Sequence, residues 1–339
     1  MIRDKKPTLK EIADLAGVTK ATVSMVLNNT GRVSQEQRDK VKRIAEELEY
    51  RPNVIAQGLA RQHMKLIGMV IPSFHDDFSH EVFLGIENYA KERGYKILVG
   101  LTNNEGDAED SIIEEFLQLK SAGLIVHPSP VVDSEQRMYR QLQQEKVPFV
   151  FYTRYPLDGN SEYNRVLCDD VLGGQLAARH LIEKGHKRIA FYTNRYVKHT
   201  NDSINKRIGY EMAHREAGLP VDPALSVSSD MFSAEYPVSS WVREHGVTAI
   251  FVSTDYTAIN LMEKLQDSGF RIPEDIAIVG YDDIRMAKFC TPKLTTVRVP
   301  KKEIGMKTAE MLLSLIERNL QPLGHEIVET PELIVRRSS

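Results

Sequence analysis

Features that would place the chain in a membrane or outside the cell are missing from its 339 residues. No run of about 18 or more apolar residues occurs, so the sequence offers no candidate transmembrane helix. The start, MIRDKKPTLKEIA, is basic but lacks the apolar stretch that follows in a secretory signal. We therefore expect a protein of the cytoplasm.

Cysteine and catalytic motifs are also scarce. Cys168 and Cys290 are far apart and match no metal-binding spacing, so both are expected to be reduced core residues. The sequence contains no glycine-rich phosphate loop and no pairing of a nucleophile with a base. Four histidines lack ligand spacing: His63, His75, His80 and His127. These absences argue against an enzyme and against a bound metal or cofactor.

The charge is unevenly distributed along the chain. The net charge is −3, yet residues 1–63 carry twelve lysines and arginines against eight acidic residues. The remainder carries thirty-two basic residues against thirty-nine acidic ones. A basic N-terminal region on an acidic body favours contact between that region and a polyanion, although an ordinary solvated surface would have the same composition.

Three short helices are predicted in residues 1–50. Thr8 and Glu11 have the spacing of a capping box, and the helix that follows ends at Gly17. Thr19 can cap a second helix, whose apolar side is formed by Val23, Val26 and Leu27. A third helix is predicted from about Gln35 to Glu49, with the apolar positions Val41, Ile44, Ala45 and Leu48. Two short helices joined by a glycine turn are typical of a helix-turn-helix unit.

The second helix has several side chains that packing does not require: Lys20, Ala21, Thr22, Ser24, Met25 and Asn28. Threonine, serine, asparagine and lysine suit phosphates and base edges. Alanine and methionine can contact only apolar features such as a thymine methyl group. An ordinary solvated helix face would also fit these residues.

Residues 51–64 have a different character. Pro52 ends the third helix, and Asn53 could cap a further helix of about eight residues that contains Gly58. So short a helix is marginal alone in water. We expect this segment to be disordered until a partner binds it.

From Lys65 onward, short apolar strands alternate with helical patterns. The first strands are LIGMVI, YKILVGL, GLIVH and PFVFYT, and after the turn-rich YPLDGNSEYN the alternation resumes with RVLCD, RIAFYTN, ALSVS, TAIFVS and IAIVGYD. This alternation predicts an α/β fold with two parallel sheets, each covered by helices on both faces.

Six blocks of the sequence together resemble the LacI/GalR family of bacterial transcription regulators. They are TLKEIADLAGVTKATVSMVLN, GRVSQEQRDKVKRIAEELEYRPNVIAQGLA, HLIEKGHKRIAF, RIGYEMAHREAG, RIPEDIAIVGYDDI and PKLTTVRVPKKEIG. The resemblance extends from about Thr8 to Arg336. It implies a helix-turn-helix head at 1–50, a hinge helix at 51–64 and an effector-binding core at 65–339 with the two-lobed fold of periplasmic sugar-binding proteins.

The resemblance also implies where the core divides. The N-subdomain would comprise about 65–164 and 294–324, and the C-subdomain about 165–291 and 325–339. The chain would then cross between the lobes near Glu162–Arg165, Thr291–Leu294 and Gly324–Glu326.

In that family the second helix lies in the major groove, which gives Lys20, Ala21 and Met25 base-facing roles. Most members carry a basic residue where this chain has Met25, so a thymine methyl contact is expected there in place of a guanine contact. Leu59 matches the leucine that wedges between central base pairs, and Ala56 lets two hinge helices approach. Leu59 could also be an apolar residue of a small core. The other implied DNA contacts are Thr8, Thr19, Thr22, Ser24, Asn28, Ser34, Tyr50 and Asn53.

The resemblance further implies a set of effector-binding residues. Arg207 matches an arginine that grips ligand oxygens, and Asp282 matches a carboxylate that accepts from ligand donors. The remaining positions are Phe78, Thr153, Arg154, Phe232, Thr254 and Asp255. Arg207 and Asp282 could instead pair with each other, and both phenylalanines could be core residues.

Two departures from the family pattern concern the ligand. Thr153 and Arg154 stand where many sugar-binding members have an aspartate, and Val299 replaces a residue that is often polar. These changes favour a ligand with an anionic or acceptor-rich group. The broad class remains a sugar or another small polar metabolite.

The sequence ends soon after its last strand, with no heptad tail of the kind that makes tetramers. The resemblance therefore implies a homodimer on a pseudo-palindromic operator in double-stranded DNA. It implies a regulator, most simply a repressor, that needs no cofactor or metal and contacts no membrane. A free solute-binding protein would need a signal peptide and no head, and an enzyme would need a catalytic constellation.

Overall fold

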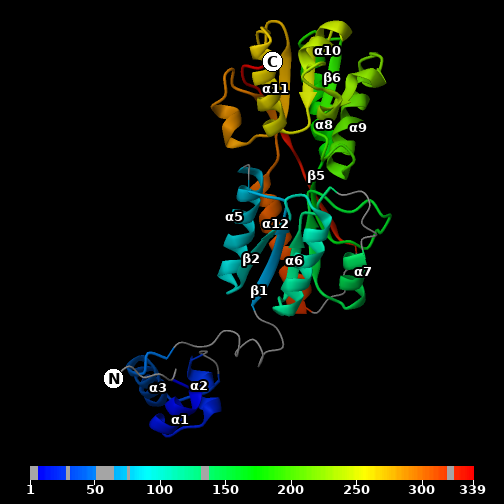
Figure 1. The fold of residues 1–339 in the computed structure, drawn as a ribbon. Coiled ribbons are helices and arrows are strands. Elements are labelled where there is room, and N and C mark those ends of the chain that lie inside the picture. Colours follow the sequence, from blue (N-terminus) through cyan, green and yellow to red (C-terminus); the bar gives the residue numbers. More distant parts are fainter. Residues whose placement is uncertain (1–6, 28–30, 51–64, 75–76, 131–136, 319–323) are drawn as a thin grey trace. The chain divides into compact units, whose positions relative to one another are not determined.

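The structure is a computed structural model that describes residues 7–27, 31–50, 65–74, 77–130, 137–318 and 324–339. The chain divides into two compact units, Met1–Met64 and Lys65–Ser339 (Figure 1). Four residues predicted to contact DNA lie outside the described residues: Asn28, Asn53, Ala56 and Leu59. None of the helices in the described segments combines the length and apolarity that crossing a bilayer requires.

The N-terminal unit, called the head below, contains helices α1 (Leu9–Ala16), α2 (Lys20–Leu27) and α3 (Gln35–Glu47). The Thr8 backbone N–H donates to the Glu11 carboxylate at 2.7 Å, and the Glu11 N–H donates to Thr8 Oγ1 at 3.3 Å, which completes the predicted capping box. The three predicted helices are confirmed, with α3 ending two residues earlier than expected.

The head has its own small core. It is built from apolar side chains of all three helices: Ile12, Ala13, Ala16, Val23, Val26, Val41, Ile44 and Ala45. Thr19 caps α2 by accepting from the Thr22 N–H at 3.1 Å, and Ser34 caps α3 by accepting from the Gln37 N–H at 3.4 Å. Packing and caps together fix the orientation of α2 within the head.

The second unit contains two six-stranded sheets, each within its own lobe (Figure 1). The first sheet has the order β11-β5-β4-β3-β1-β2, and all its pairings are parallel. Its strands are β1 (Leu66–Ile71), β2 (Lys96–Leu101), β3 (Gly123–Val126), β4 (Phe149–Tyr152), β5 (Arg165–Cys168) and β11 (Glu326–Glu329). Its helices are α5 (Asp77–Glu92), α6 (Gly106–Gln118), α7 (Arg137–Gln144) and α12 (Lys301–Arg318).

The second sheet has the order β12-β10-β9-β8-β6-β7, in which β12 pairs antiparallel with β10. Its strands are β6 (Ile189–Thr193), β7 (Ser226–Ser228), β8 (Ala249–Val252), β9 (Ala277–Asp282), β10 (Thr295–Arg298) and β12 (Glu332–Ile334). Its helices are α8 (Asp170–Glu183), α9 (Asn201–Glu216), α10 (Val238–His245) and α11 (Asp255–Asp267), with short 3-10 turns at Pro223–Leu225, Ser229–Met231 and Arg285–Lys288.

The chain crosses between the lobes three times: after β5, after β10 and after β11. The prediction placed each crossing one strand too early, near Glu162–Arg165, Thr291–Leu294 and Gly324–Glu326. In the structure β5 pairs with β4 and β11 in the first sheet, and β10 pairs with β9 in the second. The turn-rich segment before β5 therefore joins two neighbouring strands of one sheet, although its composition suggested a lobe boundary.

Helices α8 and α9 approach closely because each has a glycine that faces the backbone of the other helix. A Cβ atom added to Gly174 would overlap the backbone of Lys206, and one added to Gly209 would overlap the backbone of Val171. Only glycine allows so close an approach between helix backbones. The contact fixes the backbone of α9 at Lys206, one turn into the helix.

Candidate functional site

A cavity of about 190 Å³ lies beyond the carboxyl ends of the strands of both sheets. This is where open α/β sheets bind ligands. The first-lobe side of the cavity is formed by Pro72, Ser73, Phe78, Ser79, Asn104, His127, Thr153, Arg154 and Cys168. The second-lobe side adds Asp170, Asn194, Val197, Asp202, Lys206, Thr254, Tyr256, Tyr281 and Asp282, and Val299 lies on the crossing after β10. Sites for drug-sized ligands occupy roughly 300–1,000 Å³, so this cavity suits a more compact molecule.

An ion pair between Arg154 and Asp202 spans the two lobes. Arg154 Nε donates to Asp202 Oδ1 at 3.2 Å, and Arg154 Nη1 donates to the Pro128 carbonyl at 3.3 Å. Burial acts to raise the pKa of Asp202, but the positive charges of Arg154 and Lys206 outweigh it and hold that pKa below its ordinary value. The protein's own carboxylate therefore neutralises Arg154, which removes the reason to expect an anionic ligand.

Lys206 is the second buried cation of the cavity, and it was missed in the sequence. Its Nζ donates to the Ser253 carbonyl at 3.2 Å and lies 3.7 Å from Asp202 Oδ2. It also lies 4.1 Å from the centroid of the Tyr281 ring. Burial acts to lower the pKa of Lys206, but Asp170, Asp202 and Asp282 raise it above the ordinary value, so the ammonium group stays charged.

Arg207 does not line the cavity, which corrects the prediction that it grips the ligand. Its side chain is 45% exposed, and Nη1 donates to Glu211 Oε1 at 3.1 Å along the outer face of α9. One residue turns an α-helix by about 100°, which places Lys206 inside and Arg207 outside. The signal that could have found Lys206 is its spacing of three and four residues from the buried Gly209 and Tyr210.

Two further predicted residues belong to the surrounding structure. The Asp255 carboxylate is fully buried and accepts from the Ile284 N–H at 2.9 Å and from Thr296 Oγ1 at 2.6 Å. Phe232 stacks on Tyr192 with the ring centroids 5.8 Å apart and packs against the second-lobe core. Asp255 therefore fixes the segment after β9, and Phe232 is a packing residue, so neither prediction of ligand contact holds.

The other five predicted residues line the cavity: Phe78, Thr153, Arg154, Thr254 and Asp282. Thr153 has φ +54° and Asp282 has φ +113°, which are rare for residues with a side chain. Thr153 Oγ1 lies 2.9 Å from His127 Nδ1, a hydrogen bond that holds the threonine at the cavity. Such backbone conformations persist where surrounding contacts enforce them, as they commonly do at ligand sites.

Lys301 supplies one of those enforcing contacts. It is the first residue of α12 in the first lobe, and it is 3% exposed. Its Nζ donates to the backbone carbonyl of Asp282 and, at 3.2 Å, to that of Asp283, both at the end of β9 in the second lobe. A buried cation thus ties a cavity-lining residue of one lobe to a helix of the other.

The cavity is balanced between donors and acceptors. Tyr281 Oη donates to Asp170 Oδ1 at 2.8 Å, and burial raises the pKa of Asp170 to about 7. Burial also lowers the pKa of His127 to about 3, so this histidine is neutral. With Arg154 and Lys206 facing Asp202 and Asp282, the arrangement suits a neutral ligand that carries several hydroxyl groups.

In the head, most residues predicted to contact DNA lie at the surface. Thr8, Thr19, Lys20, Ala21 and Ser34 are exposed, whereas Thr22, Ser24, Met25 and Tyr50 are half-buried. Tyr50 packs against the head core, and Thr19 Oγ1 is hydrogen-bonded to Thr22 Oγ1 at 2.9 Å. The side chains on the first turn of α2 are therefore available to a partner.

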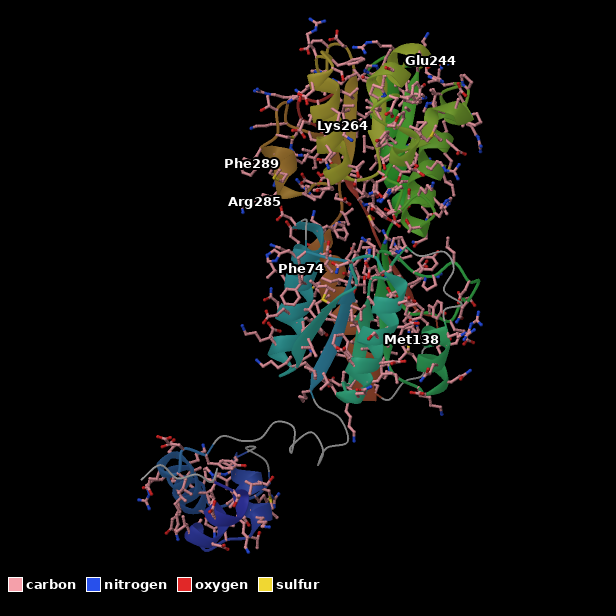
Figure 2. All side chains as sticks on the ribbon, in the orientation of Figure 1. Phe74, Met138, Glu244, Lys264, Arg285 and Phe289 are labelled. Atoms are coloured by element: carbon pink, nitrogen blue, oxygen red, sulfur yellow. The ribbon has the colours of Figure 1, made fainter. Side chains whose placement is uncertain are left out.

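A separate groove of about 590 Å³ runs beside α11 and the turn at Arg285–Lys288. It is lined by Tyr256, Met286 and Phe289, whose exposed fractions are 56%, 57% and 71%. Figure 2 labels Phe289 and Arg285 at this edge of the second lobe. Exposed apolar surfaces of this kind mark contacts with other molecules.

Within the described residues, no group of three His, Cys, Asp or Glu side chains is placed to hold a metal ion.

Comparison with known proteins relates both units to characterised ones. Residues 8–53 match the model of the bacterial regulatory proteins of the lacI family, and residues 178–339 match a periplasmic binding protein-like domain. The ribose operon repressor of Escherichia coli (strain K12) is 32% identical over 340 residues, which cover 98% of this chain and 99% of that protein.

Two solved structures resemble the fold. The transcriptional regulator CelR–cellobiose complex aligns with a TM-score of 0.70 and 28% identity over 98% of this chain and 100% of that one. The lac repressor dimer bound to operator and the anti-inducer ONPF aligns with a TM-score of 0.82 over 98% of this chain and 99% of that one. Its identity of 24% shows a shared fold alone.

The buried Asp170 carboxyl makes stability depend on pH. The folded protein keeps a proton on Asp170 up to about pH 7, whereas an unfolded aspartate loses it near 3.8. The folded state therefore binds more protons between these values, and the contribution of Asp170 to stability falls as pH rises through them. Asp170→Asn keeps an acceptor for Tyr281 and removes this dependence.

Urea unfolding of both proteins should show the Asp170→Asn variant gaining stability relative to the native chain by about 1 kcal/mol per pH unit between about pH 5 and 7. Parallel stability curves for the two proteins over that range would contradict this assignment of the proton.

Proposed function

This chain belongs to the LacI family of bacterial regulatory proteins, and we propose that it is a cytoplasmic transcriptional repressor controlled by a neutral sugar or sugar derivative. The cavity between the two lobes carries this proposal. Arg154, Lys206, Asp202 and Asp282 offer both donors and acceptors around a compact space. The chain acts in this account by binding and needs no catalytic step.

The mixed polarity of the cavity supports a sugar in particular. A hydroxyl group donates and accepts, so a ring with several hydroxyls can satisfy ammonium, guanidinium and carboxylate groups at once. Phe78, at the edge of the cavity, supplies an apolar surface for a sugar ring. Two of the similar proteins are consistent with a sugar, because one is a ribose operon repressor and the other was solved with cellobiose. D-ribose and cellobiose are therefore the first ligands to screen.

The head supplies the DNA-binding part of the proposal. The helix-turn-helix pair α1 and α2 presents Lys20 and Ala21 at the exposed start of α2, where base edges of the major groove can be reached. Thr8, Thr19 and Ser34 stand at exposed caps, suited to phosphates. Two heads of a homodimer would read a pseudo-palindromic operator. We expect the two cores of the dimer to meet at the apolar groove lined by Tyr256, Met286 and Phe289.

Ligand and DNA are coupled, in this proposal, through the angle between the lobes. Polar links between the lobes include Arg154 to Asp202, Lys301 to the end of β9, and the Arg285 N–H to Asp77 Oδ2 at 3.0 Å. A ligand that prefers one arrangement of these links shifts the population of lobe angles. Heads attached to the first lobes of a dimer would then fit the operator in one arrangement only.

Adjacent residues of α9 provide a matched test of the ligand site. Lys206→Met should lower affinity for the effector at least about tenfold, because a hydrogen bond to a charged group is lost inside the cavity. Arg207→Met likewise replaces a cation with methionine, one residue away and outside the cavity, and should leave affinity within about twofold. Calorimetric titration with the sugar that gives the largest thermal shift measures both.

Operator binding by the ligand-free variants serves as the folding control for this pair. Equal loss of ligand affinity in the two variants would contradict the assignment of Lys206, and loss in Arg207→Met alone would restore the original sequence prediction.

The DNA-binding claim is tested by selecting bound fragments from a random DNA pool. The native chain should recover a symmetric motif, and recovery of no symmetric motif would contradict the proposed function. Met25→Arg should change the preferred base at one symmetric pair of positions toward guanine, since arginine bridges guanine O6 and N7 and methionine cannot. The remaining positions of the motif should stay as they are.

A further inference from the structure

The turn that follows the second helix of the head holds the most informative contact outside the cavity. We propose that Gly31, held in place by Arg38, is a positioning residue that sets the direction of the Met25 side chain and thereby the base preference of the operator. The inference rests on the proposed function, because it concerns how the DNA-binding helix reads sequence.

Met25 lies against Gly31 in the head. A Cβ atom added to Gly31 would overlap the sulfur of Met25 and would lie 3.1 Å from its Cγ and 3.5 Å from its Cβ. Met25 is half-buried, although Lys20 and Ala21 on the same helix are exposed. Methionine has three rotatable side-chain bonds, so a surface methionine normally samples many directions. Contact with the Gly31 backbone removes part of that freedom.

Arg38 fixes the turn itself. From the first turns of α3, its Nη2 donates to the Gly31 carbonyl at 2.9 Å and its Nε donates to the Val33 carbonyl at 3.4 Å. The planar guanidinium can engage two carbonyls at once, which lysine could not do with fixed geometry. Gly31 also has φ +70°, a conformation that glycine adopts without steric cost. Arg38 thus holds the described part of the turn at both Gly31 and Val33.

Fixing a flexible side chain matters for specificity. A methionine reads DNA only through apolar contact, whose strength depends on where its terminal atoms lie. A methionine free to choose among directions would fit several base pairs about equally well. One held against Gly31 favours the base pair that matches that direction. A change at Gly31 would then lead the same helix to select a different base, without any substitution among the residues that face DNA.

Two left-handed glycines of the head provide a matched experiment. Gly31 and Gly17 both have φ +70°, but an added Cβ on Gly17 meets no atom within 4 Å. Gly31→Ala and Gly17→Ala therefore both place a Cβ at a left-handed backbone position, and only the first displaces Met25. Each full-length variant is used to select fragments from a random DNA pool beside the native chain.

The Gly31→Ala variant should change the relative preference at one symmetric pair of positions by roughly fivefold or more, the lower end of what one base-pair contact discriminates. Gly17→Ala should keep the native motif and weaken binding to all sequences alike. In a Met25→Ala background, Gly31→Ala should no longer alter preference, because the side chain that it displaces is gone.

A second pair of variants decides the matter if Gly31→Ala does not fold. Arg38→Met frees the turn without backbone strain. Arg43→Met is its control, since Arg43 is exposed and pairs along α3 with Glu47 at 3.8 Å. Arg38→Met should change preference at the same pair of positions, whereas Arg43→Met should keep the motif.

A folded Gly31→Ala or Arg38→Met variant that selects the native motif overturns the positioning role while leaving the proposed function intact. Failure of the native chain to select any symmetric motif overturns the proposed function and the inference with it.

Discussion

Charged groups buried between two lobes can persist only if they lie together. Arg154, Asp202 and Lys206 are each nearly excluded from solvent, with side chains 8%, 14% and 5% exposed. Any one of them alone would pay several kcal/mol in lost hydration. Their mutual contacts offset that cost. Asp202 and Lys206 pair within α9 of the second lobe, whereas the contact of Asp202 with Arg154 of the first lobe exists only when the lobes meet. The same ion pairs therefore determine both how the lobes are arranged and which polar groups the cavity offers to a ligand.

The same constraint explains the backbone around the cavity. Thr153, with φ +54°, precedes Arg154, and Asp282, with φ +113°, is the last residue of β9. Asp282 is held by Lys301 from the opposite lobe, so its conformation also depends on the lobes being in contact. A ligand that replaces some of these contacts changes the balance between lobe arrangements, which is the property a regulator needs.

Local features of this chain could be predicted from sequence, because they depend on neighbours along the chain. The caps at Thr8, Thr19 and Ser34 and the alternation of strands and helices are set by spacing within one or two turns. The lobe crossings, which the family resemblance implied, were each placed one strand too early. For the first of them the turn-rich segment before β5 gave no correction, since a turn has the same composition whether it joins strands of one sheet or of two. The exchange of Lys206 for Arg207 has a related cause: α9 buries Asn201, Ser203 and Lys206 along with apolar residues, which obscures its inner face. A binding site requires buried polar residues, so the apolar periodicity that marks the inner face of a helix is weakest where the helix lines a binding site.

In the proposed function, a ligand in the cavity and DNA at the head bias one equilibrium between lobe arrangements. Thermodynamic linkage then requires that the factor by which the sugar changes operator affinity equal the factor by which operator changes sugar affinity. Titrating the sugar into the dimer alone, and into the dimer saturated with its selected operator, measures the second factor directly. We predict a factor of roughly 5 to 150 that matches the one from operator titrations with and without sugar. Equal sugar affinity in the presence and absence of operator would contradict the account.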